Sequence, residues 1–356
     1  MNKTVTRSSN IELLRILMML SLIAHHFTVN SGIPQLYNFE NISKNMVLIQ
    51  IFGMWGKTAI NIFTLITGYF MVKNKLTVRK ILKIVLETVF YVYGFYVIFL
   101  ITGYEPFSVK EVIKQLLFLP LEVGNLYTGS MIAMMMFIPF CNMLIKAMSK
   151  KQYQILLILL LIYFTVLASF LNNDNFDFVF WMLTMYFIGG YIRLYSGKTD
   201  SLKVGVVCSV VSTVAMIVSI ISIDFIGNRI GITDAYYFLS DANKILAVTT
   251  SISVFIVFKN LKISYNKIIN IVASTTFGVL LIHANTAAMR RFLWVDVFNN
   301  MGHYNSKYFI IYACAVVVLV YCIAVIIDLL RQKFVESKVF RYLDKYEILH
   351  RTLYNN

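Results

Sequence analysis

Four ionisable side chains lie inside the first long apolar stretch of the sequence: Glu12, Arg15, His25 and His26. Ionisable groups are costly at the depth of a lipid bilayer, so those that occur there usually face the interior of a helix bundle and serve a site. A helix turns about 100° per residue, so the step from Arg15 to His26 completes roughly three turns and brings both side chains to one face. Glu12 lies on the same face, whereas His25 points about 100° away. Because a neutral imidazole can accept a proton from a hydroxyl, we predict that His26 acts in proton transfer.

Two further apolar stretches carry polar residues at a similar depth. Lys57 and Asn61 share one face of the second stretch, because they are one helical turn apart. His283 and Asn285 lie near the outer end of the ninth stretch. Both His283 and the histidine of the first stretch are expected in the outer half of the membrane. We therefore predict one site that contains both imidazoles, in which the residues that bind the substrate or stabilise an oxyanion are Lys57, Asn61, Asn285 and His25.

Each of these side chains also has a structural explanation. Lys57 could lie at the outer membrane interface if its helix began later, with no part in a site. A single histidine inside a membrane is more often a hydrogen-bonding partner between helices than a catalyst. Glu12, Arg15 and Glu87 could form an ion-paired structural cluster near the opposite membrane surface. The expected convergence of the two histidines favours a site over these alternatives.

The composition indicates the class of protein. Of the 356 residues, 59% are hydrophobic and only 14% are charged, whereas about 25% of the residues of a soluble domain are charged. The sequence therefore predicts an integral membrane protein. The net charge of +15 lies in short segments between the apolar stretches, which is typical of orientation in a lipid bilayer and not of nucleic-acid binding. The four cysteines lie within apolar stretches and have no metal-site spacing, so we predict neither a metal site nor a permanently bound cofactor.

Ten apolar stretches are long enough to cross a hydrocarbon core about 30 Å thick. They lie at residues 11–29, 46–72, 81–102, 126–148, 153–171, 176–195, 202–223, 243–259, 268–290 and 307–330. Lys and Arg concentrate in both terminal segments and in alternate loops, so the positive-inside rule places both termini in the cytoplasm. No linker or repeat interrupts the chain. We predict an all-α polytopic membrane protein, with one bundle of about ten transmembrane helices over residues 1–330 and a cytoplasmic amphipathic tail over residues 331–356.

The sequence resembles the membrane-bound acyltransferase-3 superfamily, which includes bacterial polysaccharide O-acetyltransferases. An arginine followed eleven positions later by a histidine, as in Arg15 and His26, is similar to the first motif of that family. The other similar segments are residues 56–69, 181–195 and 277–283. The resemblance runs in order over nearly the whole chain. One position departs from it, because many relatives have an acidic residue where this chain has Ala284.

The resemblance implies transfer of an acetyl or other acyl group from cytosolic acyl-CoA, as a co-substrate, to a hydroxyl of a cell-surface or lipid-linked glycan. It also implies that His26 is the catalytic histidine and Arg15 its partner in the motif. We add His283 to this catalytic set, because it is expected at the same depth. The expected location is the bacterial plasma membrane, and the expected partners are the lipid bilayer, the acyl-CoA donor and the glycan acceptor.

The basic segment after the second apolar stretch faces the cytoplasm in this topology. Its charges suit the phosphates of CoA, although an orientation signal is the simpler explanation of each one. The residues expected to bind acyl-CoA are Glu12, Arg79, Lys80 and Lys83. The competing interpretation is a transporter or flippase for a polysaccharide precursor, which would use the same polar helix face as a passage and leave the glycan chemically unchanged.

Overall fold

The computed structural model describes residues 8–110, 112–113, 126–171, 176–195, 197, 200–232 and 234–353. Within these residues the fold is all-α, and the β-type contact is an isolated antiparallel bridge between Thr77 and Thr352. The α-helices are α1 (Ser9–Val29), α2 (Lys44–Gly53), α3 (Gly56–Met71), α4 (Val78–Ile101), α6 (Leu126–Ala147), α7 (Lys150–Leu161), α8 (Leu167–Phe170), α9 (Phe178–Leu194), α10 (Leu202–Ile230), α11 (Ile245–Asn260), α12 (Lys267–Ala273), α13 (Thr276–Ala284), α14 (Ala287–Arg291), α15 (Asn300–His303), α16 (Phe309–Arg331) and α17 (Ser337–Leu343). Short π-helical segments follow α7, α14 and α16, at Ile162–Val166, Phe292–Val297 and Gln332–Glu336. Two 3-10 helices lie at Ile33–Leu36 and Glu347–His350.

The helices occur at the places that the sequence predicts. In the described part of the chain, 8 helical stretches are long and apolar enough to cross a membrane, and α9 and α11 are shorter apolar helices. The protein is therefore an all-α polytopic membrane protein, as predicted, while the number of crossings and the side of the termini stay predictions. The helices differ in how far protein covers them, since 56% of the most apolar part of α1 is buried, against 22% of α10. α10 thus presents most of its apolar surface outward, where it suits lipid.

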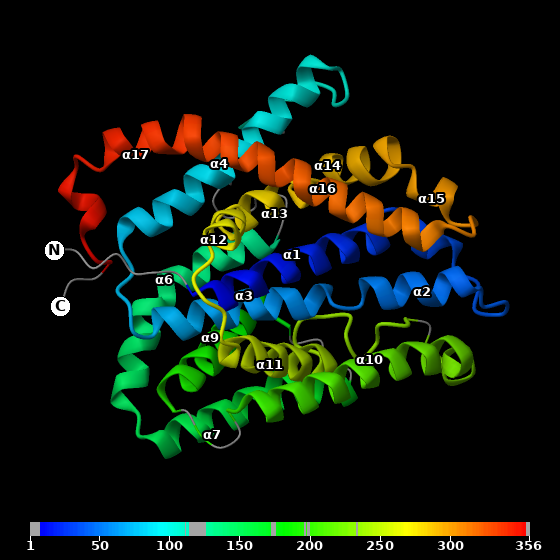
Figure 1. The fold of residues 1–356 in the computed structure, drawn as a ribbon, viewed down its shortest axis with the longest axis horizontal. Coiled ribbons are helices and arrows are strands. Elements are labelled where there is room, and N and C mark those ends of the chain that lie inside the picture. Colours follow the sequence, from blue (N-terminus) through cyan, green and yellow to red (C-terminus); the bar gives the residue numbers. More distant parts are fainter. Residues whose placement is uncertain are drawn as a thin grey trace.

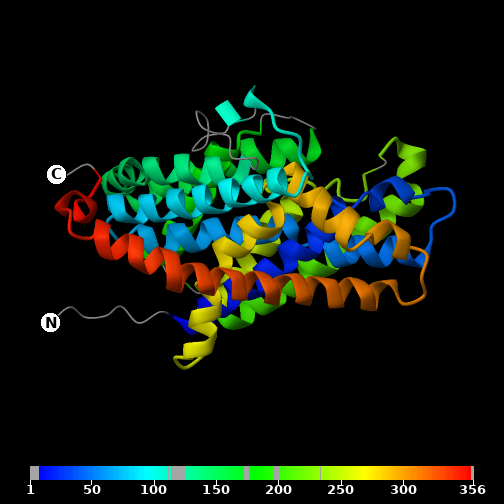
Figure 2. The ribbon, with the colours of Figure 1, turned by 90° about the horizontal axis from the view of Figure 1, so that it is seen from above.

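α1 lies at the centre of the bundle (Figure 1). It packs against α2 and α3 on one side and against α12, α13 and α16 on the other. Figure 2 shows the bundle turned by 90°, with α16 running along one edge. α3 in turn packs on α9 and α11, and α11 packs on α10. Because α1 has protein neighbours on opposite sides, its polar residues are positioned by helices that are distant in the sequence.

The second predicted span, residues 46–72, is not one continuous helix. It is interrupted after Gly53, where α2 ends and α3 begins. The interrupted segment lies directly against α1, since a Cβ atom on Gly56 would be 2.1 Å from Cγ of His25. Only glycine permits this approach. The prediction of a continuous helix was wrong because hydropathy does not reveal where a neighbouring helix must come close.

Gly56→Ala is expected to lower the melting temperature of the protein. The added methyl group overlaps the imidazole of His25, and overpacking of this kind costs about 1–3 kcal/mol. The matched control is Gly94→Ala in α4, because a Cβ atom there meets nothing within 4 Å and alanine favours a helix by roughly 0.5–1 kcal/mol. Both variants are measured in detergent by size-exclusion chromatography after heating. Equal melting temperatures for the two variants would contradict the close approach at Gly56.

The ninth predicted span, residues 268–290, is also interrupted, and it ends early. α12 and α13 are separated by Ser274 and Thr275, whose hydroxyl groups donate to backbone carbonyls three residues earlier and so compete with the helical pattern. α13 ends at Ala284, and Arg290 lies on the separate short helix α14. The prediction of one helix over this range was therefore wrong. Interrupted membrane helices leave backbone groups free at depth, which is tolerated where they are buried in protein or line a site.

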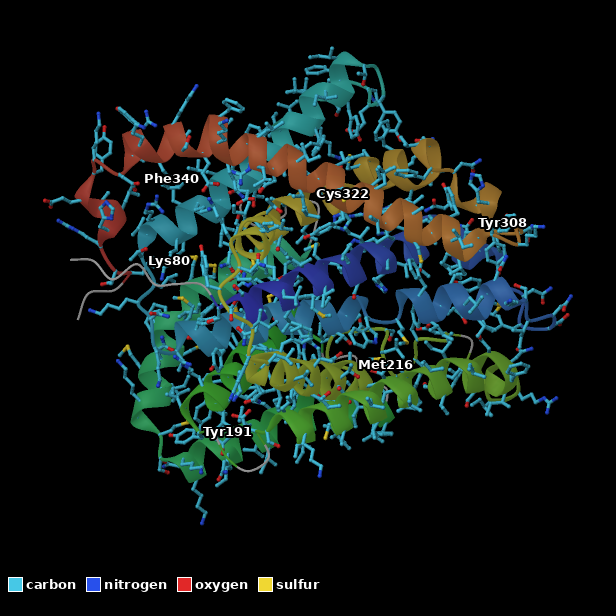
Figure 3. All side chains as sticks on the ribbon, viewed as in Figure 1. Lys80, Tyr191, Met216, Tyr308, Cys322 and Phe340 are labelled. Carbon is cyan, nitrogen blue, oxygen red and sulfur yellow. The ribbon has the colours of Figure 1, made fainter. Side chains whose placement is uncertain are left out.

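The C-terminal segment continues α16 into α17 and returns to the start of α4. Arg79 donates two hydrogen bonds, of 2.6 and 3.0 Å, to the carboxylate of Asp344 and lies over the ring of Phe340. Backbone hydrogen bonds also join this segment to the residues just before α4. Figure 3 shows Phe340 and Lys80 at one end of the molecule and Tyr308 at the opposite end. The tail is thus held by contacts within the protein, and its predicted place on the membrane surface stays a prediction.

Candidate active site

The two histidines that were predicted to converge are in direct contact. Nδ1 of His26 lies 3.0 Å from Nε2 of His283, and the ring centroids are 5.1 Å apart. His26 belongs to the last turn of α1 and His283 to the last turn of α13. His283 is completely buried, whereas His26 is only partly buried. Of this pair, His26 is therefore the ring that a substrate can reach.

Hydrogen bonding decides which ring nitrogens of the pair carry protons. Nδ1 of His283 is 2.5 Å from the carbonyl oxygen of Val279, and because a carbonyl only accepts, this nitrogen carries the proton. In the neutral ring, Nε2 of His283 is then an acceptor, to which Nδ1 of His26 donates. His26 is left with a lone pair on Nε2, and nothing in the described part of the chain is hydrogen-bonded to it. Such a lone pair on a partly exposed ring can take a proton from a hydroxyl.

His25 is held by the segment between α2 and α3. Its Nδ1 donates to the carbonyl oxygen of Gly53 at 2.9 Å, and its ring packs on Gly56. The ring centroid of Tyr236 is 6.1 Å away. These contacts give His25 a structural function, because they fix α1 against the interrupted helix. Its predicted function in substrate binding stays a prediction.

Lys57 lies in the first turn of α3, close to the histidine pair. Its Nζ is 3.8 Å from Oδ1 of Asp241, and its charge acts on the ring of His26. The carboxylate compensates part of the cost of a lysine in the first turn of a membrane helix. Lys57 therefore faces the site and not only the outer membrane interface.

The two asparagines predicted for the site differ in their partners. Nδ2 of Asn61 donates to the carbonyl of Ala242 at 2.6 Å, and its Oδ1 accepts from the indole of Trp181 at 2.9 Å. Asn285 is also completely buried, yet neither of its amide atoms has a hydrogen-bond partner among the described residues. A buried polar group without a partner costs about 1–3 kcal/mol. Asn285 is thus available to a ligand, whereas Asn61 ties α3 to its neighbours.

Comparison with known families decides the class of protein. The profile of a family described as an acyltransferase domain matches residues 8–329, which include both histidines of the site. The chain belongs to the acyltransferase-3 family. It is therefore a membrane acyltransferase. No curated protein and no solved structure matches the chain.

At the other end of α1 in this acyltransferase, the guanidinium of Arg15 lies 4.0 Å from the carboxylate of Glu12. The distance from Arg15 to His26 along the helix is about 16 Å, so the two side chains act at different depths. Glu87, the third member of the alternative structural cluster, pairs instead with Arg331 at 2.9 Å. The cluster expected as an alternative is thus divided between two places.

The basic residues predicted to bind acyl-CoA lie at the end of the acyltransferase where the C-terminal segment docks. Arg79 pairs with Asp344, and Nζ of Lys83 is 2.6 Å from the carboxylate of Glu336. Lys80 is exposed and donates to a backbone carbonyl at 2.9 Å. Phosphates of CoA would therefore meet Lys80 directly, and would have to replace a carboxylate at each of the other two. Their predicted function stays a prediction.

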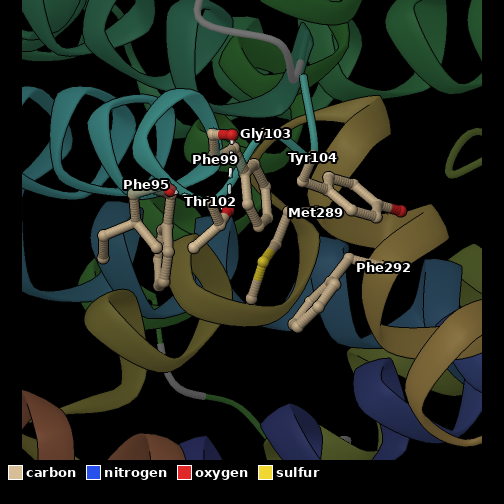
Figure 4. Close-up of a pocket in the computed structure, with 8 residues that line it drawn as sticks. Phe95, Phe99, Thr102, Gly103, Tyr104, Met289 and Phe292 are labelled. Atoms are coloured by element: carbon tan, nitrogen blue, oxygen red, sulfur yellow. Dashed lines mark hydrogen bonds between the residues drawn. The ribbon is translucent and has the colours of Figure 1, made fainter. Parts of the chain in front are cut away.

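An apolar cavity of about 440 Å³ lies at the outer end of α4, beside α14. Figure 4 shows Met289 and Phe292 of the α14 segment next to Phe99 of α4, and the rings of Phe99 and Phe292 are 5.4 Å apart. Neither histidine of the catalytic pair lines this cavity. Its lining offers few hydrogen-bonding groups, so the cavity suits an apolar chain better than a sugar.

Two charged residues beside the site of the acyltransferase were missed in the sequence, because both were assigned to outer loops. Asp241 pairs with the lysine of the site. Arg290 donates from Nη1 to the carbonyl of Ala284 at 3.1 Å, and its charge acts on His26. The available signal was that Arg290 follows His283 by about two helical turns. No group of three or more His, Cys, Asp or Glu side chains in the described residues is placed to hold a metal ion.

Proposed function

We propose that this acyltransferase transfers an acetyl or another acyl group from acyl-CoA to a hydroxyl of a cell-surface or lipid-linked glycan in the bacterial plasma membrane, with His26 as the general base. The observation that supports this most strongly is the contact between His26 and His283, because it leaves a lone pair on the exposed side of the catalytic ring. Membership of the acyltransferase-3 family supports acyl transfer. The resemblance described above supports the donor and the acceptor.

The proposed reaction needs a base and a group that stabilises negative charge. Nε2 of His26 takes the hydroxyl proton while the acceptor oxygen forms a bond to the thioester carbonyl carbon, whose π electrons move to the carbonyl oxygen. The oxyanion then collapses, the C–S bond breaks, and His26 returns the proton to the CoA thiolate. His283 holds Nδ1 of His26 throughout, so the ring stays oriented when it becomes charged.

The donor is proposed to approach from the end of the bundle that carries Lys80. Positive side chains there suit the phosphates of CoA. Arg15 lies between that end and His26, on the same face of α1 by helix geometry. This arrangement supports a path for the donor along α1 from the predicted cytoplasmic side to the histidine pair.

The chemistry of the surface glycan in cells that lack the gene tests the proposal. Acyl transfer predicts that the polymer is still made and exported but lacks its ester-linked acyl groups, and that the wild-type gene restores them. A transporter or flippase predicts instead that the polymer is missing from the surface while its chemistry is unchanged. Mass spectrometry of the purified glycan, before and after mild alkali removes the esters, distinguishes these outcomes. A normal, fully acylated polymer in the deletion cells would contradict both.

A further inference from the structure

Arg290 carries a charge beside the catalytic pair that no acidic group in the described part of the chain neutralises. It is half-buried, and its hydrogen bond goes to the backbone carbonyl of Ala284, with no carboxylate within ion-pair distance. The neighbouring Arg291, by contrast, is exposed and lies 3.9 Å from Asp296. Burial lowers the pKa of Arg290, as expected for a cation in a poorly solvated place. Such a position is costly unless an anion is present at some stage.

Two cations act on the ring of His26, and they differ in what they can offer a substrate. Lys57 already has the carboxylate of Asp241 as its partner. Arg290 has a fork of N–H donors, of which the bond to Ala284 uses only one. Of the two, Arg290 is therefore the cation whose charge and donors remain available in the described structure.

The bond to Ala284 has a structural explanation of its own. A basic side chain often satisfies a free carbonyl at the C-terminus of a helix, and Ala284 is the last residue of α13. This explains one N–H group of Arg290 but not the missing anion. The next residue, Asn285, also has a buried amide without a partner in the described residues. The segment that follows His283 thus contains unused donors next to the catalytic pair.

We propose that Arg290 donates hydrogen bonds to the oxyanion that forms on the thioester carbonyl when His26 removes the proton of the acceptor hydroxyl. The inference rests on the acyl transfer proposed above. The proton goes to Nε2 of His26, the new C–O bond forms, and the carbonyl electron pair becomes the negative charge that Arg290 meets. That charge disappears when the C–S bond breaks. A fixed cation in a poorly solvated site stabilises such a charge far more than the same cation does in water.

The test uses membranes of deletion cells that express each variant, since these membranes contain both the enzyme and its natural acceptor. The probe is radiolabelled acetyl-CoA, and the readout is label in alkali-labile esters per amount of enzyme. Arg290→Ala is expected to lower kcat by about 10²–10³-fold, with little change in the KM for acetyl-CoA. Guanidinium ions added to the assay are expected to restore part of kcat, because they can occupy the vacated place. The matched control is Arg291→Ala, which removes the same charge from the next residue and is expected to leave kcat unchanged.

Arg290→Gln separates the charge from the helix contact. Its amide can still donate to the carbonyl of Ala284 but carries no charge, so a loss of kcat similar to that of Arg290→Ala supports the proposal. This variant also decides the matter if Arg290→Ala does not accumulate in the membrane. Full kcat in either variant, a change in KM alone, or normal kcat in Arg290→Gln beside a loss in Arg290→Ala would overturn it. No transfer by wild-type membranes would instead contradict the proposed function itself.

Discussion

His26→Ala is expected to abolish acyl transfer while the protein accumulates normally in the membrane. Loss of a general base costs about 10²–10⁴-fold in rate, and no other group in the described structure is placed to replace Nε2 of His26. The ring is only partly buried, so its removal leaves most of the core intact. The measurement is twofold: the rate of CoA release in isolated membranes, and the ester-linked acyl groups on the glycan of deletion cells that express the variant.

The matched control for this experiment is His350→Ala. His350 is exposed near the C-terminal end of the chain and is hydrogen-bonded to a backbone carbonyl. Its removal is expected to leave both readouts unchanged. Normal acylation of the glycan by His26→Ala, at equal amounts of protein, would exclude His26 as the base.

His283→Ala is expected to produce the second largest loss, on the order of 10²–10⁴-fold in kcat, by analogy with triads in which the orienting partner of a catalytic histidine is removed. His283 is a positioning residue, because it is completely buried and acts through His26. Without it, Nδ1 of His26 has no acceptor, so the proton can occupy either ring nitrogen and the base is present only part of the time. The measurement is kcat as a function of pH in isolated membranes.

His283→Gln distinguishes this positioning function from a packing function. The glutamine carbonyl oxygen can accept the hydrogen bond from Nδ1 of His26, so this variant is expected to retain more activity than His283→Ala. Its pH profile is expected to be closer to that of the wild type. Equal losses in both variants with an unchanged pH profile would indicate that His283 serves only to fill space.

Much of the histidine pair could be predicted from the sequence. The lengths of the apolar stretches give the depth of each residue, and helical periodicity shows which residues share a face. These two rules place His26 and His283 at similar depth, and the 3.0 Å contact follows once α1 and α13 are neighbours. That they are neighbours was an expectation, because a single sequence does not show which helices pack together.

The partners of the other predicted residues could not be predicted in this way. The amide of Asn61 is held by Trp181 and Ala242, which are 120 and 181 positions away in the chain. Asp241 and Arg290 lie outside the regular helices that periodicity describes, so their charges were assigned to loops although they return to the site. The interruption at Gly56 was equally hidden, because it depends on the close approach of α1 and not on local propensity.

The proton acceptor behind the catalytic pair is a main-chain oxygen, that of Val279. Where many relatives are expected to have an acidic side chain, this chain has Ala284, so the orientation of the second imidazole does not depend on a carboxylate there. An amide oxygen is not neutralised when the surroundings become acidic, and no substitution of its own side chain removes it. An enzyme whose catalytic face opens toward the cell exterior is thereby protected, at this one joint, from changes in the acidity of its surroundings.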